Sequence, residues 1–252
     1  MGKLIILSGP SGVGKGPLTD ALIAYFGSIG LKLHKHVLYN DRSIRPGEQD
    51  GITYHFRSTN DLLALHEKNP EQYAKIEVRK DLQLLDFVKL QEEIDLFDIV
   101  LLEIYYKKIP DVLKLITDKN NAIEMANSKK KDTKKAVDKI KAKHIFVSPL
   151  CKDDFASTDI WENEQKRAAA IKAVMLTKLK NRGTETNKKQ QERSDTAAEE
   201  LDNAINTNAE ILTNHFGEDN KHWWQLFHDF VSVPGALELA KTFIMFEQMV
   251  LE

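Results

Sequence analysis

A glycine-rich stretch close to the start of the chain limits the fold more than any other feature. It runs Gly9-Pro-Ser-Gly-Val-Gly-Lys15, directly after the apolar residues 4–7 and directly before a helical pattern of apolar residues. Glycines let consecutive backbone N–H groups turn inward around a phosphate, and the N-terminus of the next helix adds partial positive charge. The lysine supplies a point charge that reaches the β- and γ-phosphates of a nucleotide. The spacing therefore predicts a buried parallel strand, a phosphate-binding loop and a helix.

Two further apolar runs are separated from the first by helical patterns. They cover residues 98–104 and 144–149. Apolar strands that alternate with helices are typical of an α/β protein with a parallel sheet. We expect helices over residues 60–66, 86–96, 160–214 (with a break at 181–186) and 236–251, and a last strand over 230–233.

The composition excludes several classes of protein. The 252 residues carry 36 Lys and Arg against 38 Asp and Glu, a formal charge of −2, so we expect no nucleic-acid partner. The single cysteine, Cys151, cannot form an internal disulfide or a cysteine-based zinc site, and we expect it to be a buried hydrophobe. No apolar run reaches the roughly 18 residues of a membrane span, and the apolar stretch at the start is too short for a secretory signal. These features predict a cytoplasmic protein without a membrane partner, and they leave a homo-oligomer open.

The residues after Lys15 depart from the usual pattern of such loops. A serine or threonine normally follows the lysine, because its hydroxyl binds Mg²⁺. This chain has Gly16 and Pro17 instead, and a proline suits the first helical turn, where its missing N–H costs little. Water, the phosphates and an acid at a strand end would have to hold the ion, with Thr19 a weak substitute for the hydroxyl.

A second polar stretch covers residues 42–54. Arg42 and Arg45 are three residues apart, and their forked guanidinium groups offer donors for a second anionic group. Glu48 can hold one guanidinium in place, and the hydroxyl of Tyr54 can add a donor. Taken alone, this stretch also fits a surface turn with ordinary ion pairs.

Together the two stretches closely resemble guanylate kinase. The matching motifs are Gly-Pro-Ser-Gly-Val-Gly-Lys-Gly at residues 9–16 and Arg-x-x-Arg-Pro-Gly-Glu-x-Asp-Gly-x-x-Tyr-x-Phe at residues 42–56. Residues 181–186, with Arg193 eleven residues after Arg182, look like the lid of that family. The order of the motifs holds across most of the chain, interrupted by insertions near residues 119–143, 152–176 and 214–228.

The resemblance implies a fold and a division of the chain. The fold would be an α/β parallel sheet of the P-loop NTPase type, flanked by helices, with a small subdomain for a nucleoside monophosphate and a helical lid. The partners would be small-molecule nucleotides, and the cofactors ATP and Mg²⁺. The core would comprise residues 1–36 and 98–252, the acceptor subdomain residues 37–97, the lid residues 178–196 and a lysine-rich insertion residues 119–143.

The resemblance also implies roles for single residues. Lys15 and the loop amides would hold the ATP phosphates, while Arg182 and Arg193 on the lid would neutralise the transferring phosphoryl group. The acceptor phosphate would be bound by Arg42, Arg45 and Tyr54, with Glu48 orienting Arg45. Lys178 takes the place of a further lid arginine. The implied catalytic residues are Lys15, Arg42, Arg182 and Arg193; the ATP-binding residues are Gly9, Pro10, Ser11, Gly12, Val13, Gly14, Lys15 and Gly16; the acceptor-binding residues are Arg42, Arg45, Glu48, Tyr54, Glu77 and Glu103; no protein residue is assigned as a metal ligand.

Departures from the family concentrate in base recognition. A serine that reads guanine is Leu38 here, a second strand-end acid is Tyr105, and an asparagine near the adenine pocket is Pro234. Glu77 would replace the base-reading glutamate, and Glu103 an aspartate near the acceptor and the metal. A polar site rejects the wrong base by leaving its own groups unpaired, so the loss of readers relaxes or changes specificity.

These observations predict a nucleoside monophosphate kinase that moves the γ-phosphoryl group of ATP to GMP, dGMP or a related monophosphate. Phosphoryl transfer needs positioning and charge stabilisation, which arginines on mobile elements supply. Two alternatives stay open. One is a kinase of the same fold for another phosphomonoester, such as a ribosyl phosphate or a modified nucleotide, which the lost base readers favour. The other is a guanylate-kinase-like binding module without turnover, which Gly16-Pro17 and Lys178 favour.

Three other features have simpler interpretations. The lysine-heavy residues 128–135 fit a solvated helix or a mobile insertion better than a patch for an anionic partner. The aromatic residues 222–230 fit core packing better than a partner surface. His34 and His36 are the closest histidine pair, and no carboxylate or cysteine nearby in the sequence completes a metal cluster, so we expect surface or core histidines.

Overall fold

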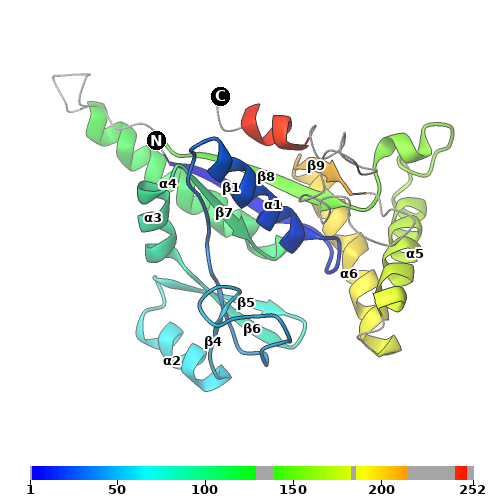
Figure 1. The fold of residues 1–252 in the computed structure, drawn as a ribbon, viewed down its shortest axis with the longest axis horizontal. Helices are drawn as coiled ribbons and strands as arrows, with labels where there is room; N and C mark the ends of the chain where they lie inside the picture. Colours follow the sequence, from blue (N-terminus) through cyan, green and yellow to red (C-terminus); the bar gives the residue numbers. More distant parts are fainter. Residues whose placement is uncertain (1, 129–138, 183–185, 215–241, 249–252) are drawn as a thin grey trace. The chain divides into compact units, whose positions relative to one another are not determined.

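The computed structural model describes residues 2–128, 139–182, 186–214 and 242–248 and has an α/β architecture (Figure 1). The chain forms two compact units. The first comprises Met1–Leu4 and Lys32–Ala142, and the second comprises Ile5–Leu31 and Lys143–Glu252. Strand β1 (Lys3–Ser8) begins in the first unit and ends in the second.

The first unit contains a parallel strand pair. Strands β2 (Leu33–Lys35) and β7 (Ile99–Glu103) run side by side, with Leu33 opposite Ile99. The first four residues of β7 are buried on both faces, as is typical of a parallel strand, and only Glu103 at its end is partly exposed. The strand predicted over residues 98–104 is therefore confirmed. The helices of this part are α3 (Phe87–Leu96), the short 3-10 helix η1 (Tyr106–Lys108) and α4 (Ile109–Ser128).

A four-stranded sheet in the same unit has the order β4-β3-β6-β5. Strands β5 and β6 form an antiparallel hairpin, and the two-residue strand β3 pairs with both β6 and β4. Helix α2 packs on one face, where Leu62, Tyr73, Leu82 and Leu84 form a small core. The elements are β3 (Tyr39–Asn40), β4 (His55–Phe56), α2 (Thr59–Lys68), β5 (Tyr73–Val78) and β6 (Asp81–Asp86).

The helices predicted over residues 60–66 and 86–96 are confirmed as α2 and α3. Helix α2 starts at a capping box, in which the hydroxyl of Ser58 accepts from the backbone N–H of Asp61. Helix α3 starts at Asp86, whose carboxylate accepts from the backbone N–H of Lys89 at 3.0 Å. Each cap satisfies a backbone donor that the first helical turn leaves without a partner.

The second unit contains the glycine-rich loop, which joins β1 to helix α1 (Lys15–Ser28). In the sheet β1 is followed by β8 (Lys141–Ser148) and then by β9 (Glu210–Thr213), with β8 and β9 parallel. The strand predicted over residues 144–149 is confirmed. The prediction of helix up to residue 214 is wrong at its end, because residues 210–213 pair with β8 as a strand.

Two long helices of the second unit pack against each other (Figure 1). They are α5 (Glu164–Arg182) and α6 (Asn187–Asn206), so the predicted long helices are confirmed. Most of the predicted break at 181–186, residues 183–185, lies outside the described residues. Residues 242–248 form a further helical stretch, and its Phe243 stacks on Tyr25 of α1 with ring centroids 4.2 Å apart. The core beside α5 and α6 is made by Phe146, Ile171, Met175, Ala197, Ala198, Leu201 and Ala204.

The predicted α/β fold with parallel strands and flanking helices is confirmed. Cys151 is half-buried just before the short 3-10 helix η3 (Lys152–Phe155), so the prediction of a buried cysteine is wrong. The predicted strand over 230–233, the aromatic segment 222–230, Pro234 and most of the lysine-heavy segment lie outside the described residues. Among the helices that the structure describes, none combines the length and the apolar character that a membrane crossing requires.

Candidate functional site

Glycines shape the loop between β1 and α1. Gly9, Gly12 and Gly14 adopt φ angles of +139°, +93° and +98°, which residues other than glycine rarely adopt. A Cβ atom at Gly9 would also lie only 2.4 Å from the carbonyl oxygen of Val147 on β8. The loop therefore requires these glycines, and their conformations are those of a chain that turns its amides inward.

Lys15, the first residue of α1, folds back over the loop. Its Nζ donates to the carbonyl oxygens of Gly9 at 2.7 Å and Pro10 at 3.1 Å. The ammonium group is thus held above the loop, where a bound phosphate would meet it. Of the sequence-predicted residues, Gly9 to Gly14 form the loop, and Lys15 and Gly16 begin α1.

Asn214, directly after β9, supports the loop from a distant part of the chain. Its Nδ2 donates to the carbonyl oxygen of Val13 at 2.7 Å, and its backbone N–H donates to Ser148 at 2.7 Å. The side chain is fully buried. Sequence reasoning missed this residue, because 201 positions separate it from Val13 and no local motif marks it.

A serine–histidine pair lies beneath the start of the loop. The hydroxyl of Ser8, the residue before Gly9, lies 2.7 Å from Nε2 of His144 on β8. Burial lowers the pKa of His144 from about 6.5 to about 4, so its imidazole is neutral at neutral pH. The pair was also missed from the sequence, since the two residues are 136 positions apart.

The position after the loop lysine is spatially open. A Cβ atom added at Gly16 would meet no heavy atom within 4 Å. Thr19, the expected weak substitute for a metal-binding hydroxyl, is only 1% exposed, and its Oγ1 has no hydrogen-bond partner among the described residues. The hydroxyl that such loops usually supply is therefore missing, although the site has room for it.

The expected lid residues lie on α5 and α6. Helix α5 packs beside the loop, since the Cβ of a residue at Gly12 would lie 3.6 Å from Cδ2 of Leu179. Burial lowers the pKa of the neighbouring Lys178 to about 8. Arg193 is buried on α6, at 8% exposure, and Arg182 is the last residue of α5.

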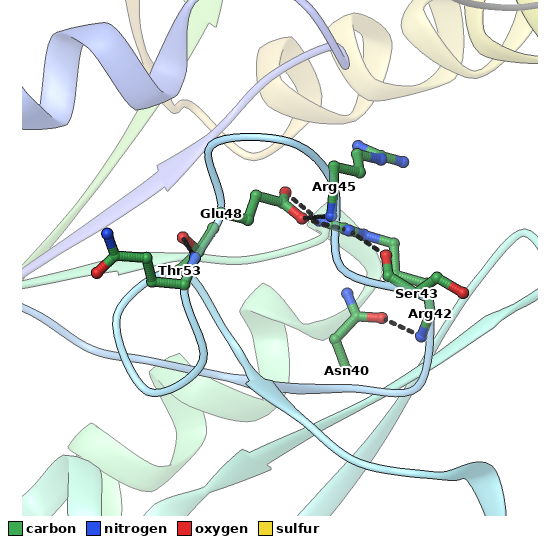
Figure 2. A network of polar contacts seen from close by, with 7 residues as sticks. Asn40, Arg42, Ser43, Arg45, Glu48 and Thr53 are labelled. Carbon is green, nitrogen blue, oxygen red and sulfur yellow. Dashed lines mark hydrogen bonds and ion pairs between the residues drawn. The ribbon is translucent and has the colours of Figure 1, made fainter.

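Arg42 and Glu48 form the centre of a polar cluster in the first unit (Figure 2). The Arg42 guanidinium donates through Nη2 to Oε1 of Glu48 at 2.5 Å and through Nη1 to Oε2 at 2.7 Å. The guanidinium also lies over the rings of Tyr54 and Phe56, at 5.2 and 5.4 Å from their centroids. This pairing lowers the pKa of Glu48, so the carboxylate is ionised and Arg42 has a fixed orientation.

Glu48, which was expected to hold one guanidinium and to orient Arg45, holds the guanidinium of Arg42 and contacts Arg45 through the backbone. From Arg45, Glu48 accepts a hydrogen bond of the backbone N–H, at 2.8 Å, while the Arg42 guanidinium binds both of its carboxylate oxygens. The guanidinium of Arg45 points away from Glu48 in Figure 2, and the described part of the chain offers it no hydrogen-bond partner. Arg45 thus presents its charge to solvent, beside a pair that fixes its backbone.

Tyr54 connects the other expected acceptor residues. Burial of its hydroxyl raises its pKa well above the ordinary value, and the charge of Glu103 raises it further. The charges of Arg42, Arg45 and Glu48 also act on this hydroxyl. Four of the other five residues predicted for the acceptor, all but Glu77, therefore lie within electrostatic reach of Tyr54.

The structure does not bring Glu77 to this cluster. Directly opposed residues of a sheet project to the same face, and Glu77 is opposite Leu82, which belongs to the core under α2. Asn40 is opposite Gln83, the next residue of β6, and so projects to the other face. Glu77, which was predicted only from loose spacing, therefore projects from the other face of the sheet than Asn40 and lies away from the Arg42 cluster.

A carboxylate that is distant in the sequence joins His34 and His36, and His36 is the core histidine that the sequence allowed. Glu93 on α3 lies 2.5 Å from Nδ1 of His36 and 3.1 Å from Nε2 of His34. Burial alone would raise the pKa of Glu93, but the two imidazoles outweigh it and lower the pKa to about 2. Within the described ranges no group of three such side chains could hold a metal ion, and the carboxylate of Glu93 contacts both histidines.

Comparisons with known proteins agree with the loop and the arginine cluster. The guanylate kinase family model matches residues 1–94, which include both. This part of the chain is therefore similar to guanylate kinases. The curated relatives include the guanylate kinase of Desulfotalea psychrophila, 39% identical over 67 residues, and that of Cupriavidus metallidurans, 33% identical over 124 residues.

These alignments leave much of each protein uncovered. They span 27% of this chain and 31% of the Desulfotalea protein, and 49% of this chain and 54% of the Cupriavidus protein. The chain therefore matches about a third to a half of the length of these relatives. The match to the crystal structure of guanylate kinase from Anaplasma phagocytophilum covers 100% of this chain and 87% of that protein. The TM-score is 0.52 at 15% sequence identity, so the two proteins share a fold.

Proposed function

We propose that this chain is an ATP-dependent nucleoside monophosphate kinase that phosphorylates GMP, dGMP or a related monophosphate. In this reaction a phosphate oxygen of the acceptor attacks the γ-phosphorus of ATP, and ADP leaves. The observation that carries the proposal is the Arg42–Glu48 pair beside Tyr54, in the same family-matched segment as the loop of Lys15. A phosphate loop alone would fit many nucleotide-binding proteins, whereas a second anion site is needed for an acceptor that itself carries a phosphate.

The ATP-binding residues would be those of the loop. Its glycine conformations allow backbone amides to face the ATP phosphates, and Lys15 is already held above them by two carbonyl oxygens. ATP would supply the γ-phosphoryl group. Mg²⁺, which bridges and neutralises nucleotide phosphates, would be held there by water and the phosphates, because Gly16 offers no hydroxyl.

The acceptor half would be the arginine cluster. Arg42 is fixed by Glu48 and retains N–H groups beyond the three bonds that the described residues account for. Arg45, with its exposed guanidinium, would complete a forked grip on the acceptor phosphate, and the hydroxyl of Tyr54 would add a third donor. The lid residues Lys178, Arg182 and Arg193 would neutralise the negative charge of the transferring phosphoryl group in the transition state.

A kinase for a different phosphomonoester is the second candidate, and one observation favours it. Leu38, which replaces the base-reading serine, is buried at 4% exposure, and Glu77 faces away from the arginine cluster. Neither can hydrogen-bond a guanine next to Arg42. A ribosyl phosphate or a modified nucleotide needs no guanine readers, and such a substrate would use the same arginines.

We expect the core, the acceptor subdomain and the lid to have the bounds given by the sequence, and we expect a cytoplasmic enzyme whose partners are small nucleotides.

The test is coupled ADP release with Mg-ATP and a panel of acceptors. The panel is GMP, dGMP, AMP, CMP, UMP, dTMP, IMP and ribose phosphates, with a blank without acceptor for ATP hydrolysis. Turnover with a purine monophosphate supports the proposal, and turnover with ribose phosphates alone supports the second candidate. ATP binding without ADP release across the panel would contradict both and leave a binding module.

A further inference from the structure

Asn40 is a buried amide in the acceptor cluster that sequence reasoning did not single out. It lies on β3, two residues before Arg42, and is only 1% exposed. Its Oδ1 accepts from the backbone N–H of Arg42 at 3.0 Å. Its Nδ2 has no hydrogen-bond partner among the described residues. Buried amide nitrogens are nearly always paired in native proteins, so this donor needs an explanation.

The orientation of the amide follows from its one bond. A carboxamide has one oxygen, which accepts, and one nitrogen, which only donates. Turning it over would set Nδ2 against the N–H of Arg42, two donors facing each other. Oδ1 of Asn40 therefore accepts from the backbone, and Nδ2 is left as a donor without an acceptor in the described residues.

The face of the sheet directs this donor toward the acceptor site. Asn40 is opposite Gln83, so it projects away from the core that α2 covers. The charge of Asp81, which shares that face, acts on the Arg42 guanidinium. In Figure 2 the amide of Asn40 points from its strand toward the loop that carries Arg42 and Glu48. The unpaired nitrogen thus belongs to the same cluster as the arginine proposed to bind the acceptor phosphate.

We propose that Asn40 is a further binding residue of the acceptor site, whose Nδ2 donates to an oxygen of the bound monophosphate. The inference rests on the proposed function. Two oxygens offer the required chemistry, a phosphate oxygen and an oxo group of the base. Since Oδ1 is held by Arg42, the site cannot reverse its polarity and accept from an amino group at this point.

The two sources of the oxygen predict different ligand preferences. If Nδ2 meets a base oxo group, GMP and IMP bind at least tenfold more tightly than AMP, which carries an amino group at the same ring position. If Nδ2 meets a phosphate oxygen, then GMP, IMP, AMP and ribose 5-phosphate all depend on Asn40 to the same extent. Either result identifies Asn40 as a group that touches the substrate.

The first test measures dissociation constants by calorimetry for these four ligands with the whole chain and with the variants Asn40→Asp and Asn40→Ala. Asn40→Asp has the same shape and keeps the acceptor for the Arg42 N–H, but it removes the donor. We expect both variants to lose at least tenfold in affinity, for the oxo ligands alone or for all four. Unchanged affinities in folded variants would overturn the proposal.

The matched control is Asn120→Asp. Asn120, on α4, donates through Nδ2 to the carbonyl oxygen of Ile140 and accepts from its N–H, so both ends of its amide are satisfied within the protein. This variant should lose stability while keeping all four dissociation constants. An equal loss of affinity in the control would mean that buried amides act here only through the fold.

A second measurement needs no variant of Asn40 to fold. In the wild-type chain, the side-chain amide protons of Asn40 are followed by ¹⁵N-edited NMR, assigned with the variants, during titration with GMP and ribose 5-phosphate. A downfield shift with slower solvent exchange supports the proposal, and its absence in a protein that binds the ligand overturns it. If the wild-type chain binds none of the four ligands, the proposed function itself fails.

Discussion

Glu48 holds Arg42 with two parallel hydrogen bonds, of 2.5 and 2.7 Å, while also accepting from the backbone N–H of Arg45 at 2.8 Å. One carboxylate thus fixes the side chain of one arginine and the backbone of the other. Both side chains of the pair are largely buried, with 11% of Arg42 and 17% of Glu48 exposed. Glu48 therefore prearranges the anion site, and a bound phosphate has to share Arg42 with it.

Replacing Glu48 by glutamine tests this prearrangement. Glu48→Gln keeps the shape but removes the charge, so one donor of Arg42 loses its acceptor and the guanidinium gains freedom. We expect the KM for the acceptor to rise about tenfold, the KM for ATP to stay unchanged, and the free energy of unfolding to fall by about 1–3 kcal/mol. Steady-state kinetics and chemical denaturation measure these. Glu71→Gln, at an exposed position of the same unit, is the control and should change neither.

Removal of the loop lysine tests the donor half. Lys15→Ala should lower turnover at least about 1000-fold, because the charge that stabilises the transferring phosphoryl group is lost. The fold should persist, since the bonds of Lys15 to the carbonyl oxygens of Gly9 and Pro10 are local to the loop. Circular dichroism and coupled ADP release check the two halves of this expectation. Activity close to wild type would mean that ATP binds elsewhere.

Local chemistry made the loop and the arginine cluster predictable from the sequence. Glycines at Gly9, Gly12 and Gly14 mark the positions with positive φ, and the arginines stand close together in the chain. The hairpin of β5 and β6 was not predicted, because its sequence lacks a comparable local signal. Its turn runs through Arg79 at a φ of +60°, where glycine or asparagine would be expected, so the usual turn signal is missing.

The missed site residues depend on contacts across long stretches of sequence. Asn214 contacts the loop only because β9 pairs with β8. Strand β9 is too short for an alternation of apolar and polar residues to predict it. Glu93 joins His34 and His36 only because α3 packs beside β2 and β7. Sequence patterns encode periodicity and turns, whereas such contacts are determined by tertiary packing.

The open space at Gly16 predicts a gain of function. Gly16→Ser places a hydroxyl directly after Lys15, where such loops usually bind Mg²⁺, and nothing within 4 Å obstructs its Cβ. We expect the Mg²⁺ concentration for half-maximal activity to fall about three- to tenfold, measured by titration at saturating ATP. Gly27→Ser is the matched control, because it lies on the same helix and is equally open. An unchanged Mg²⁺ requirement in Gly16→Ser would show that the ion lies away from this position.

The buried His144 predicts a loss of stability in acid. Its pKa is about 6.5 in the unfolded chain and about 4 in the folded one, so below pH 6.5 the unfolded state binds more protons. The stability is therefore complete above pH 6.5 and falls as the pH drops toward 4, by about 2–3 kcal/mol at pH 4.5. Denaturation between pH 7 and 4.5 should show a smaller slope in His144→Gln than in the wild type. His66→Gln, which removes a histidine from the other unit, should keep the wild-type slope.

Lys178 predicts an alkaline limit on catalysis. Burial lowers its pKa to about 8, so its positive charge is present below pH 8 and is lost above it. If the lid uses this charge on the phosphoryl group, kcat should fall about three- to tenfold between pH 7 and pH 9. Lys178→Arg should remove this decline, because a guanidinium stays protonated throughout the range. Lys180→Arg, an exposed neighbour on α5, is the control and should retain it. A decline that persists in Lys178→Arg would assign the alkaline limit to another group and remove Lys178 from the lid charges.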